Sequence, residues 1–447
     1  MKKLIAFILV AVMAFALSGC GGLANLKNVE LPPLPDASAQ QADPTPIPTA
    51  EIDTSSSTAE STLPQHVIVS MESHAEQHFD PQNGETLIFS FSYDTPRVYI
   101  EGRDAAMSAI NEYIATLDET YYTGNDYGVS SEYIADGTIS GVNAMLEAAT
   151  DNYAYAVENG LTDVAMEFSS SRTARVERID SRVLSLVYNT NTFTGGAHGN
   201  YSDLAYNFDT ESGERITLES LSADSAQLIK FFSDYLINII KIYNEEENTY
   251  YSERLYPDLV VEGEDSPVAA LVREGAWYFN NEGIVFFAQP YEIGPYASGI
   301  VEFTVPYAEL AGVIDDKYLP PEHDTEPGAL ELKAQSEVED GSIEIIDKLT
   351  VDENGEALCL EAVGTVYDLR ISQVDYIESF YETARLWAAS YMSDCVLQLE
   401  TLIPDGLPKL MVSYRDANGV QTKLLLTQSG ENGAYILMNE ADIAAVG

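Results

Sequence analysis

The chain has 447 residues, of which 45% are hydrophobic, so it is long enough for two or three domains with large apolar cores. Its formal net charge of -50, from 72 acidic and 22 basic residues, argues against nucleic acid and other polyanions as partners, because binding them requires a basic patch. The same charge favours cationic proteins as partners, although solubility alone would also explain it.

The amino terminus has the pattern of a bacterial lipoprotein signal. Lysines at positions 2 and 3 precede an apolar run from Leu4 to Leu17, which is shorter than the roughly 20 residues that a membrane helix needs. The sequence Leu-Ser-Gly-Cys at 17–20 resembles a lipobox, in which cleavage leaves a lipid-modified cysteine as the first residue. These features predict a signal peptide over 1–20 and a mature protein outside the cytoplasm, anchored to the cell membrane by lipid on Cys20. The alternative is an ordinary signal peptide with a chance cysteine.

Residues 21–64 are predicted to be a disordered linker. The segment contains no aromatic residue and is rich in Pro, Ser, Thr and Ala, so it cannot bury enough apolar area to fold. An extended linker of this composition would hold the folded part away from the membrane.

The segment 65–205 is predicted to be a first folded module of strands and helices. Apolar residues recur at three- and four-residue spacing in two stretches, which predicts amphipathic helices over Ala106–Leu117 and Val142–Val157, the second ending at Asn159-Gly160. Alternating apolar and polar positions predict the strands. These strands are His66–Ser70, Leu87–Tyr93, Val164–Phe168, Val183–Phe193 and Tyr201–Phe208.

The segment 206–312 is predicted to be a second module. It begins with an Asp-to-Gly turn over Asp209–Gly213 and continues with an amphipathic helix over Leu228–Tyr243. Two short apolar strands flank Asn280–Gly283, which indicates a hairpin, and a further strand covers Val301–Val305.

The segment 325–447 is predicted to be a smaller, β-rich domain beyond a proline-rich boundary. Asp352–Gly355 and Asp416–Gly419 lie between apolar runs and favour hairpin turns over calcium loops, since no helices flank them as in an EF-hand. One helix is predicted over Tyr376–Met392. Cys359 and Cys395 fit either a disulfide or two buried thiols. The fold class predicted for the whole chain is α+β, with antiparallel sheets packed against helices.

Two motifs resemble a known family. The first runs from Tyr188 to Gly199 and is followed by Tyr206–Asp209 and Ser212-Gly213. The second consists of Gly283–Phe287, Tyr291–Gly299 and Phe303–Tyr307. Both resemble the paired extracytoplasmic domains of unknown function in RsiV-type anti-sigma factors and PdaC-type peptidoglycan deacetylases, and the resemblance covers about Gln65 to Gly312. In RsiV-type proteins this ectodomain binds lysozyme. Neither a sigma-binding segment nor a metal-binding deacetylase domain is recognisable in the sequence, so we expect neither anti-sigma signalling nor deacetylation.

The first motif supplies three candidate ligand-binding residues, Gly195, Gly196 and His198. Glycines permit positive φ angles and a close approach of backbone, and they flank an imidazole that is able to bind a ligand or act as a general base. The alternative is a structural turn. Catalysis requires a nucleophile or second acid beside the base, and the sequence offers no recognisable partner.

The second motif supplies two more candidates, Tyr291 and Tyr296, which would form an aromatic lip for a partner. A packed loop between two strands is the alternative. His74 and His78 are four residues apart, but no third metal ligand is evident, so we expect surface residues and predict no metal and no cofactor.

The sequence therefore predicts a non-catalytic binding protein of the cell envelope rather than an enzyme. The expected partner is a cationic, lysozyme-like hydrolase. Binding of peptidoglycan or another carbohydrate is the alternative, and a hydrolase centred on His198 is a third hypothesis.

Overall fold

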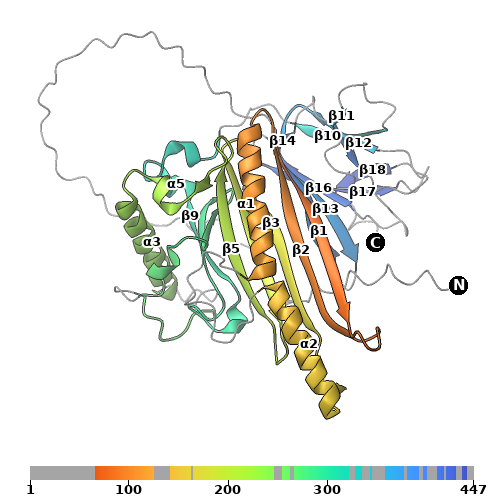
Figure 1. Cartoon of the computed structure of the whole chain (residues 1–447). Helices are drawn as coiled ribbons and strands as arrows, with labels where there is room; N and C mark the ends of the chain where they lie inside the picture. The colour runs from red at the N-terminus through yellow and green to blue at the C-terminus, as the bar shows by residue number, and fades with distance from the viewer. Residues whose placement is uncertain are drawn as a thin grey trace, which may run out of the picture. The chain divides into compact units, whose positions relative to one another are not determined.

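The chain divides into two units, Met1–Thr62 and Leu63–Gly447, and every residue described below belongs to the second. The structure is a computed structural model, shown in Figure 1. It describes residues 66–124, 141–162, 165–245, 254–261, 266–321, 328–334, 343–344, 358–376, 380–391, 396–399, 410–416, 419–428 and 435–439. The predicted signal peptide, Cys20 and the predicted linker lie outside these residues.

An eleven-stranded sheet dominates the second unit, with the order β18-β17-β16-β13-β14-β1-β2-β3-β4-β5-β6. Neighbouring strands are antiparallel except β2 and β3, which are parallel. The strands of its amino-terminal half are β1 (Val67–Phe79), β2 (Leu87–Ile100), β3 (Phe168–Ile179), β4 (Val183–Phe193), β5 (Asn200–Asp209) and β6 (Arg215–Ile216). The predicted α+β class is confirmed.

The carboxy-terminal region is β-rich, and five of its strands continue the same sheet. The connection is the short antiparallel pairing of β1 with β14, which places Ile68 opposite Ala388 and Val69 opposite Trp387. The five strands are β13 (Val366–Tyr376), β14 (Phe380–Tyr391), β16 (Leu410–Arg415), β17 (Gln421–Gln428) and β18 (Tyr435–Asn439).

The predicted helix over Tyr376–Met392 is wrong, because Phe380–Tyr391 forms strand β14 between β13 and β1. Trp387 packs into the core beside β1 to β5, whereas Leu386 and Ala388 pack into the carboxy-terminal core on the opposite face. A strand buried on both faces loses the apolar–polar alternation that identifies strands in a sequence.

A second correction concerns β3, which begins at Phe168 rather than Val164 and extends to Ile179. The charged side chains of Arg172 and Arg178 occupy inward positions in this strand, each only 2% exposed. Buried arginines interrupt an apolar pattern, so the alternation in the sequence did not reveal the strand. Arg172 is held by Asp118 and by the carbonyl of Leu117, while its guanidinium lies over tyrosine rings.

Two helices cover one face of the amino-terminal strands (Figure 1). Helix α1 (Asp104–Thr123) packs its apolar stripe on β1 to β5, and α2 (Val142–Asn159) packs on β2 and β3. Both helices end at a glycine in the left-handed conformation, Gly124 at φ 72° and Gly160 at φ 64°, as expected for helix C-caps. The predicted amphipathic helices and the stop at Asn159-Gly160 are thus confirmed.

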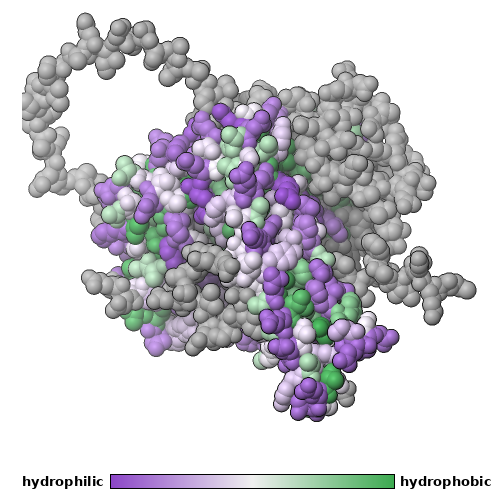
Figure 2. Space-filling view, viewed as in Figure 1, coloured by the Kyte–Doolittle hydropathy of each residue, from purple (hydrophilic) through white to green (hydrophobic). Residues whose placement is uncertain are grey.

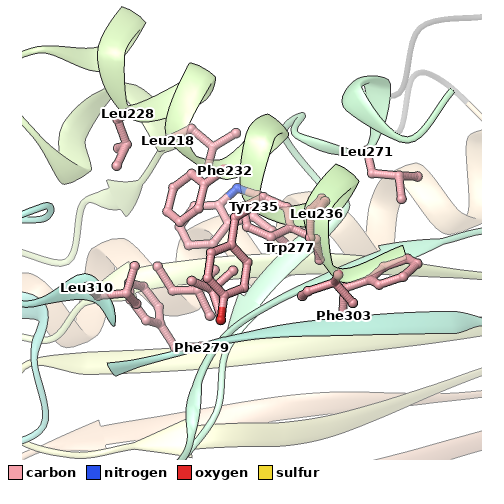
Figure 3. Packing of buried hydrophobic residues seen from close by; sticks show 14 of the residues in the cluster. Leu218, Leu228, Phe232, Tyr235, Leu236, Leu271, Trp277, Phe279, Phe303 and Leu310 are labelled. Carbon is pink, nitrogen blue, oxygen red and sulfur yellow. The ribbon is translucent and has the colours of Figure 1, made fainter. Parts of the chain in front are cut away.

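The second predicted module consists of a helix on a three-stranded sheet. Helix α3 (Ser225–Glu245) packs on β7 (Trp277–Phe279), β8 (Gly283–Ala288) and β9 (Val301–Pro306), and α5 (Tyr307–Leu310) follows. Figure 3 shows Phe232 and Leu236 of α3 above Trp277 and Phe279. Short 3-10 helices in this part are η2 (Leu218–Leu221), η3 (Ala269–Leu271), η4 (Tyr296–Ser298) and η5 (Asp316–Tyr318).

The three-stranded sheet packs its other face on β4 and β5. Val187 and Ala205 contact Tyr278 and Phe287 in one apolar cluster, and the hydroxyl of Ser185 accepts a hydrogen bond from the amide of Phe279 at 3.1 Å. The predicted module boundary between residues 205 and 206 falls inside β5, so this strand serves both predicted modules.

The remaining strands form a four-stranded sheet in the carboxy-terminal region, namely β10 (Ala329–Ala334), β11 (Ile343–Glu344), β12 (Leu358–Val363) and β15 (Val396–Leu399). Cys359 of β12 is buried and forms no disulfide among the described residues, and burial raises the pKa of its thiol, while Cys395 lies outside the described residues. β16 and β17 pair as a hairpin across Asp416 and Gly419, as predicted, while Asp352–Gly355 lies outside the described residues. Among the described helices, none has the length and apolar content required to cross a membrane.

Candidate functional site

The first motif forms the turn between β4 and β5, where Thr192 pairs with Asn200. Gly195 and Gly196 have φ angles of 92° and 97°, and a Cβ on either would meet no atom within 4 Å. The positive φ, rather than a lack of space, therefore accounts for these glycines. His198 is exposed on the turn, with Nδ1 2.8 Å from the Gly199 carbonyl oxygen.

The second motif forms the loop between β8 and β9. Tyr291 has a φ of 70°, which non-glycine residues rarely adopt, and its side chain is 55% exposed. Gly294 is needed for a close approach, because a Cβ there would lie 1.9 Å from the carbonyl oxygen of Arg254. This packing holds the loop so that Tyr296, in η4, points back to the first motif.

The two motifs meet in one aromatic cluster, defined as His198, Tyr201, Tyr291 and Tyr296. The rings of His198 and Tyr296 stack with centroids 4.1 Å apart and planes 24° apart, and Tyr201 and Tyr291 flank Tyr296 at 5.4 and 5.6 Å. The Tyr296 hydroxyl donates to the Gly199 carbonyl at 2.7 Å. All five predicted ligand-binding residues thus lie together: His198, Tyr291 and Tyr296 in the cluster, and Gly195 and Gly196 in the turn that supports it.

A polar network fixes the second loop against β5 beneath this cluster. The Gln289 side chain accepts from the Asp203 amide at 3.1 Å and donates to the Asp203 carbonyl at 2.6 Å, as a neighbouring strand would. The buried Asp203 carboxylate accepts from Asn189 at 2.6 Å and from Arg175 at 2.9 Å. A fully bonded network of this kind holds its members in one arrangement, so the cluster is preorganised.

Burial raises the pKa of both Tyr201 and Tyr296, and the neighbouring tyrosines add to the effect. Both phenols therefore stay protonated at neutral pH and present neutral O–H groups. The cluster combines apolar ring area with hydrogen-bonding groups, which suits recognition of a partner surface.

On its other side the same turn forms one wall of a pocket of about 290 Å³. Gly195 and Gly196 line it together with Tyr155 of α2 and with Leu161 and Met166 of the segment before β3. The last three side chains are 61%, 44% and 52% exposed, which gathers apolar surface in one place. Figure 2 shows apolar surface at the end of the molecule where α2 lies in Figure 1.

The sequence around this pocket is acidic. From Asp104 to Ser171 the chain contains aspartate and glutamate but no lysine, arginine or histidine, and this stretch includes all of α2. The pocket is thus built largely from a stretch of chain that carries no basic residue.

His74 and His78 lie on β1, and each imidazole ring lies near a different glutamate. His74 Nε2 is 3.7 Å from Glu72 and His78 Nε2 is 3.2 Å from Glu76, while the His74 ring stacks on Tyr93 at 4.5 Å. In the part of the chain that the structure describes, no group of three or more His, Cys, Asp or Glu residues is placed to hold a metal ion.

Some residues of the site were not singled out by the sequence. Tyr201 belongs to the regular apolar–polar alternation of strand β5, so it did not stand out as a site residue. Gln289 is a single glutamine directly after a strand and forms no recognisable motif. The apolar pocket is formed by α2, the segment before β3 and the 194–199 turn together, so no local sequence pattern predicts it.

Comparison with known proteins adds a family for part of the chain. Residues 222–308 match the model of a protein of unknown function, DUF3298. These residues run from the start of α3 to α5 and include the loop with Tyr291 and Tyr296. No curated protein matches the chain.

Two solved structures of DUF3298 family proteins resemble the fold. One, from Bacteroides fragilis, is 19% identical, covers 55% of this chain and 94% of its own, and has a TM-score of 0.40. The other, from Pseudomonas aeruginosa, is 17% identical, covers 57% of this chain and 97% of its own, and has a TM-score of 0.35.

Proposed function

We propose that this protein is an exported, non-catalytic binding protein that holds a cationic, lysozyme-like hydrolase at the 194–199 turn. The observation that carries the proposal is the meeting of the two motifs, in which Tyr296 stacks on His198 and donates to Gly199. The partner would contact the aromatic cluster on one side of the turn and the apolar pocket on the other.

The chemistry of both flanks supports this function. Tyrosine provides large contact area at low entropic cost, and Tyr291 is the most exposed tyrosine of the cluster. Exposed apolar side chains at Tyr155 and Met166 extend the surface. Apolar contact would supply specificity, and the acidity of the chain would speed the encounter with a basic partner.

The resemblance of both motifs to RsiV-type ectodomains supports a lysozyme-like partner in particular. A non-catalytic role agrees with the surroundings of His198. Within the described part of the chain, its ring contacts the Gly199 carbonyl and the Tyr296 ring, and neither provides the acid or nucleophile that a general base needs.

Titration calorimetry with a cationic lysozyme at low salt tests the proposal on the exported chain. We expect saturable binding that weakens about tenfold or more in Tyr291→Ala and in Met166→Lys, because each removes contact area from one flank of the turn. Both residues are more than half exposed, so the variants should fold.

Val420→Ala and Val420→Lys are the matched controls, since Val420 is 58% exposed in the carboxy-terminal region, and they should bind as the unaltered chain does. Absence of saturable binding to several lysozymes would exclude this partner.

The proposed location rests on Cys20. A Cys20→Ser change should release the protein into the medium or leave the precursor uncleaved, as cell fractionation and mass measurement would show. A mature, membrane-bound Cys20→Ser protein would contradict lipid anchoring.

Binding of peptidoglycan is the second candidate, and the exposed ring of Tyr291 favours it because sugars stack on such rings. Purified cell wall would then pull down the protein equally well at low and high salt, whereas binding to a basic protein should be sensitive to salt.

A further inference from the structure

A second pocket, of about 210 Å³, lies where four distant parts of the chain meet. Its walls come from Arg178–Asp180 at the end of β3, from Asn281 at the tip of the β7–β8 hairpin, from Pro320 and Pro321, and from the carboxy-terminal region. The charged and aromatic residues of that last part are Tyr367, Asp368, Arg415 and Asp416. It shares no residue with the aromatic cluster or the first pocket. Ligand sites occur preferentially at such junctions between parts of a fold.

One buried arginine of this pocket, Arg178, has a hydrogen-bond donor without an acceptor among the described residues. Arg178 is 2% exposed, and its Nε and Nη1 donate to Asp180 at 2.6 Å and to Tyr307 at 2.7 Å. Its Nη2 is buried and has no hydrogen-bond partner among the described residues, whereas the Nε of Arg415 lies 3.5 Å from the Asp368 carboxylate. Buried donors are nearly always satisfied in folded proteins, so Arg178 Nη2 calls for an oxygen acceptor inside the pocket.

The charge of the walls argues against an anion as that acceptor. Two arginines face three aspartates, and Asp368 is shared between Arg415 and Arg370 outside the pocket. When Arg370 is counted as well, three positively charged side chains offset three negatively charged ones. A carboxylate or phosphate would add an uncompensated buried charge, which is costly, whereas a neutral oxygen adds none.

The walls offer acceptors as well as donors, because aspartate carboxylates stand beside the guanidinium groups. An amide matches this arrangement, since its carbonyl accepts from an arginine while its N–H donates to a carboxylate. The volume equals about seven waters at roughly 30 Å³ each, so it holds one small group rather than a large ligand.

The backbone conformation at Asp368 also indicates a preformed site. Asp368 has a φ of 48°, and it shares a positive φ only with Tyr291 among the described non-glycine residues. Asn281 donates to its carboxylate at 2.9 Å, so the hairpin tip and the carboxy-terminal strands fix each other at the pocket. Unusual backbone of this kind persists where surrounding contacts hold it in place.

We propose that this pocket binds a small, uncharged amide group, such as the acetamido group of an N-acetylated sugar or a capped peptide bond. In this proposal the carbonyl oxygen accepts from Arg178 Nη2, and the amide N–H donates to an aspartate of the wall. This site is independent of the proposed binding of a basic protein at the 194–199 turn.

Ligand-observed NMR on the full exported chain tests the site with four probes. N-acetylglucosamine and N-acetylalaninamide carry the amide, glucose has hydroxyls without an amide, and acetate is the anion. We expect saturable binding of one or both amides and much weaker binding of glucose and acetate. The amide that binds more tightly shows whether the natural ligand is an N-acetylated sugar or a capped peptide bond.

Two variants from different segments locate the binding. Arg415→Gln and Asn281→Ala should each weaken amide binding about tenfold, because each removes a contact that holds the Asp368 carboxylate in the pocket. Arg97→Gln is the control, since Arg97 pairs with Glu72 on the surface and lies outside the pocket. The melting temperature of each variant confirms folding.

Three results would overturn the proposal. They are no saturable binding of either amide, amide binding that both variants leave unchanged, and binding of acetate or glucose as tight as that of the amides.

Discussion

The residues that shape the 194–199 turn owe their identity to backbone conformation rather than to contacts. Gly195 and Gly196 have open space around them and φ angles above 90°, so a side chain would fit but the backbone would be strained. Tyr291 accepts a positive φ itself, which turns its ring outward beside Tyr296. At this scale the site depends on strained or glycine-dependent backbone positions.

A valine at position 196 should therefore destabilise the protein. We expect Gly196→Val to lower the free energy of unfolding by about 1–3 kcal/mol, because a β-branched residue is strained at positive φ. Urea unfolding measures the loss. Gly196→Asn should cost less, since asparagine tolerates this region better, and His198→Ala should leave stability nearly unchanged. Equal stability of the valine variant and the unaltered chain would remove the conformational explanation.

Tyr307 predicts a specific pH dependence. Burial raises its pKa to about 12, although the nearby Arg178 opposes the shift, and its hydroxyl donates to the Asn280 carbonyl at 2.8 Å. An unfolded tyrosine ionises near pH 10, so the folded state holds this proton longer. The stability it contributes should be complete below about pH 10 and should decline as pH rises toward 12.

Urea unfolding of the unaltered chain and of Tyr307→Phe, at a series of pH values, measures this contribution. The difference should be about 1–2 kcal/mol at neutral pH, constant to about pH 9.5, and smaller above pH 10. A difference that stays constant or grows above pH 10 would contradict the assignment.

Among the elements, α3 and the three-stranded sheet form the part of the chain that matches DUF3298. Phe232 is fully buried and packs on Phe286 with ring centroids 4.8 Å apart, whereas Ile229 of the same helix is 37% exposed. This sheet in turn packs on β4 and β5 and places the Tyr296 loop beside the first motif. The core under α3 therefore supports the aromatic cluster from a distance.

Truncating a side chain in that core tests how α3 packs on the three-stranded sheet. Phe232→Ala should lower the free energy of unfolding by about 3–5 kcal/mol, because it leaves a cavity between helix and sheet. Ile229→Ala, one turn earlier, should cost less than about 1 kcal/mol, and chemical unfolding compares the two. Similar losses from both changes would mean that α3 is not packed as described.

The whole molecule is strongly acidic, and this property bears on kinetics more than on affinity. Long-range attraction speeds the approach of a basic partner, while contacts at the interface determine how long the complex lasts. Salt reduces the range of the attraction from about 10 Å at 0.1 M to about 3 Å at 1 M.

Association with a cationic lysozyme should therefore slow sharply as salt rises, and dissociation should change less. Surface plasmon resonance over this range of salt gives both rates separately. A complex whose dissociation carries most of the salt dependence would show that charge pairs within the interface, rather than long-range steering, dominate.

Local patterns were sufficient for much of this fold. The spacing of apolar residues predicted α1, α2 and α3, because a helix buries one face whatever it packs against. Asparagine and aspartate at turns bond to their own neighbouring amides, which made the turns at 209–213 and 280–283 recognisable. The glycines and aromatic residues of the two motifs were also visible as candidates.

Tertiary structure alone decided the rest. β14 looks helical because both of its faces are buried, and β3 is concealed by arginines that find partners on other elements. The stacking of Tyr296 on His198 joins segments about a hundred residues apart, since Tyr296 and Gly199 are separated by 97 positions. Contacts of this kind depend on how sheets pack on one another, and no short stretch of sequence contains that information.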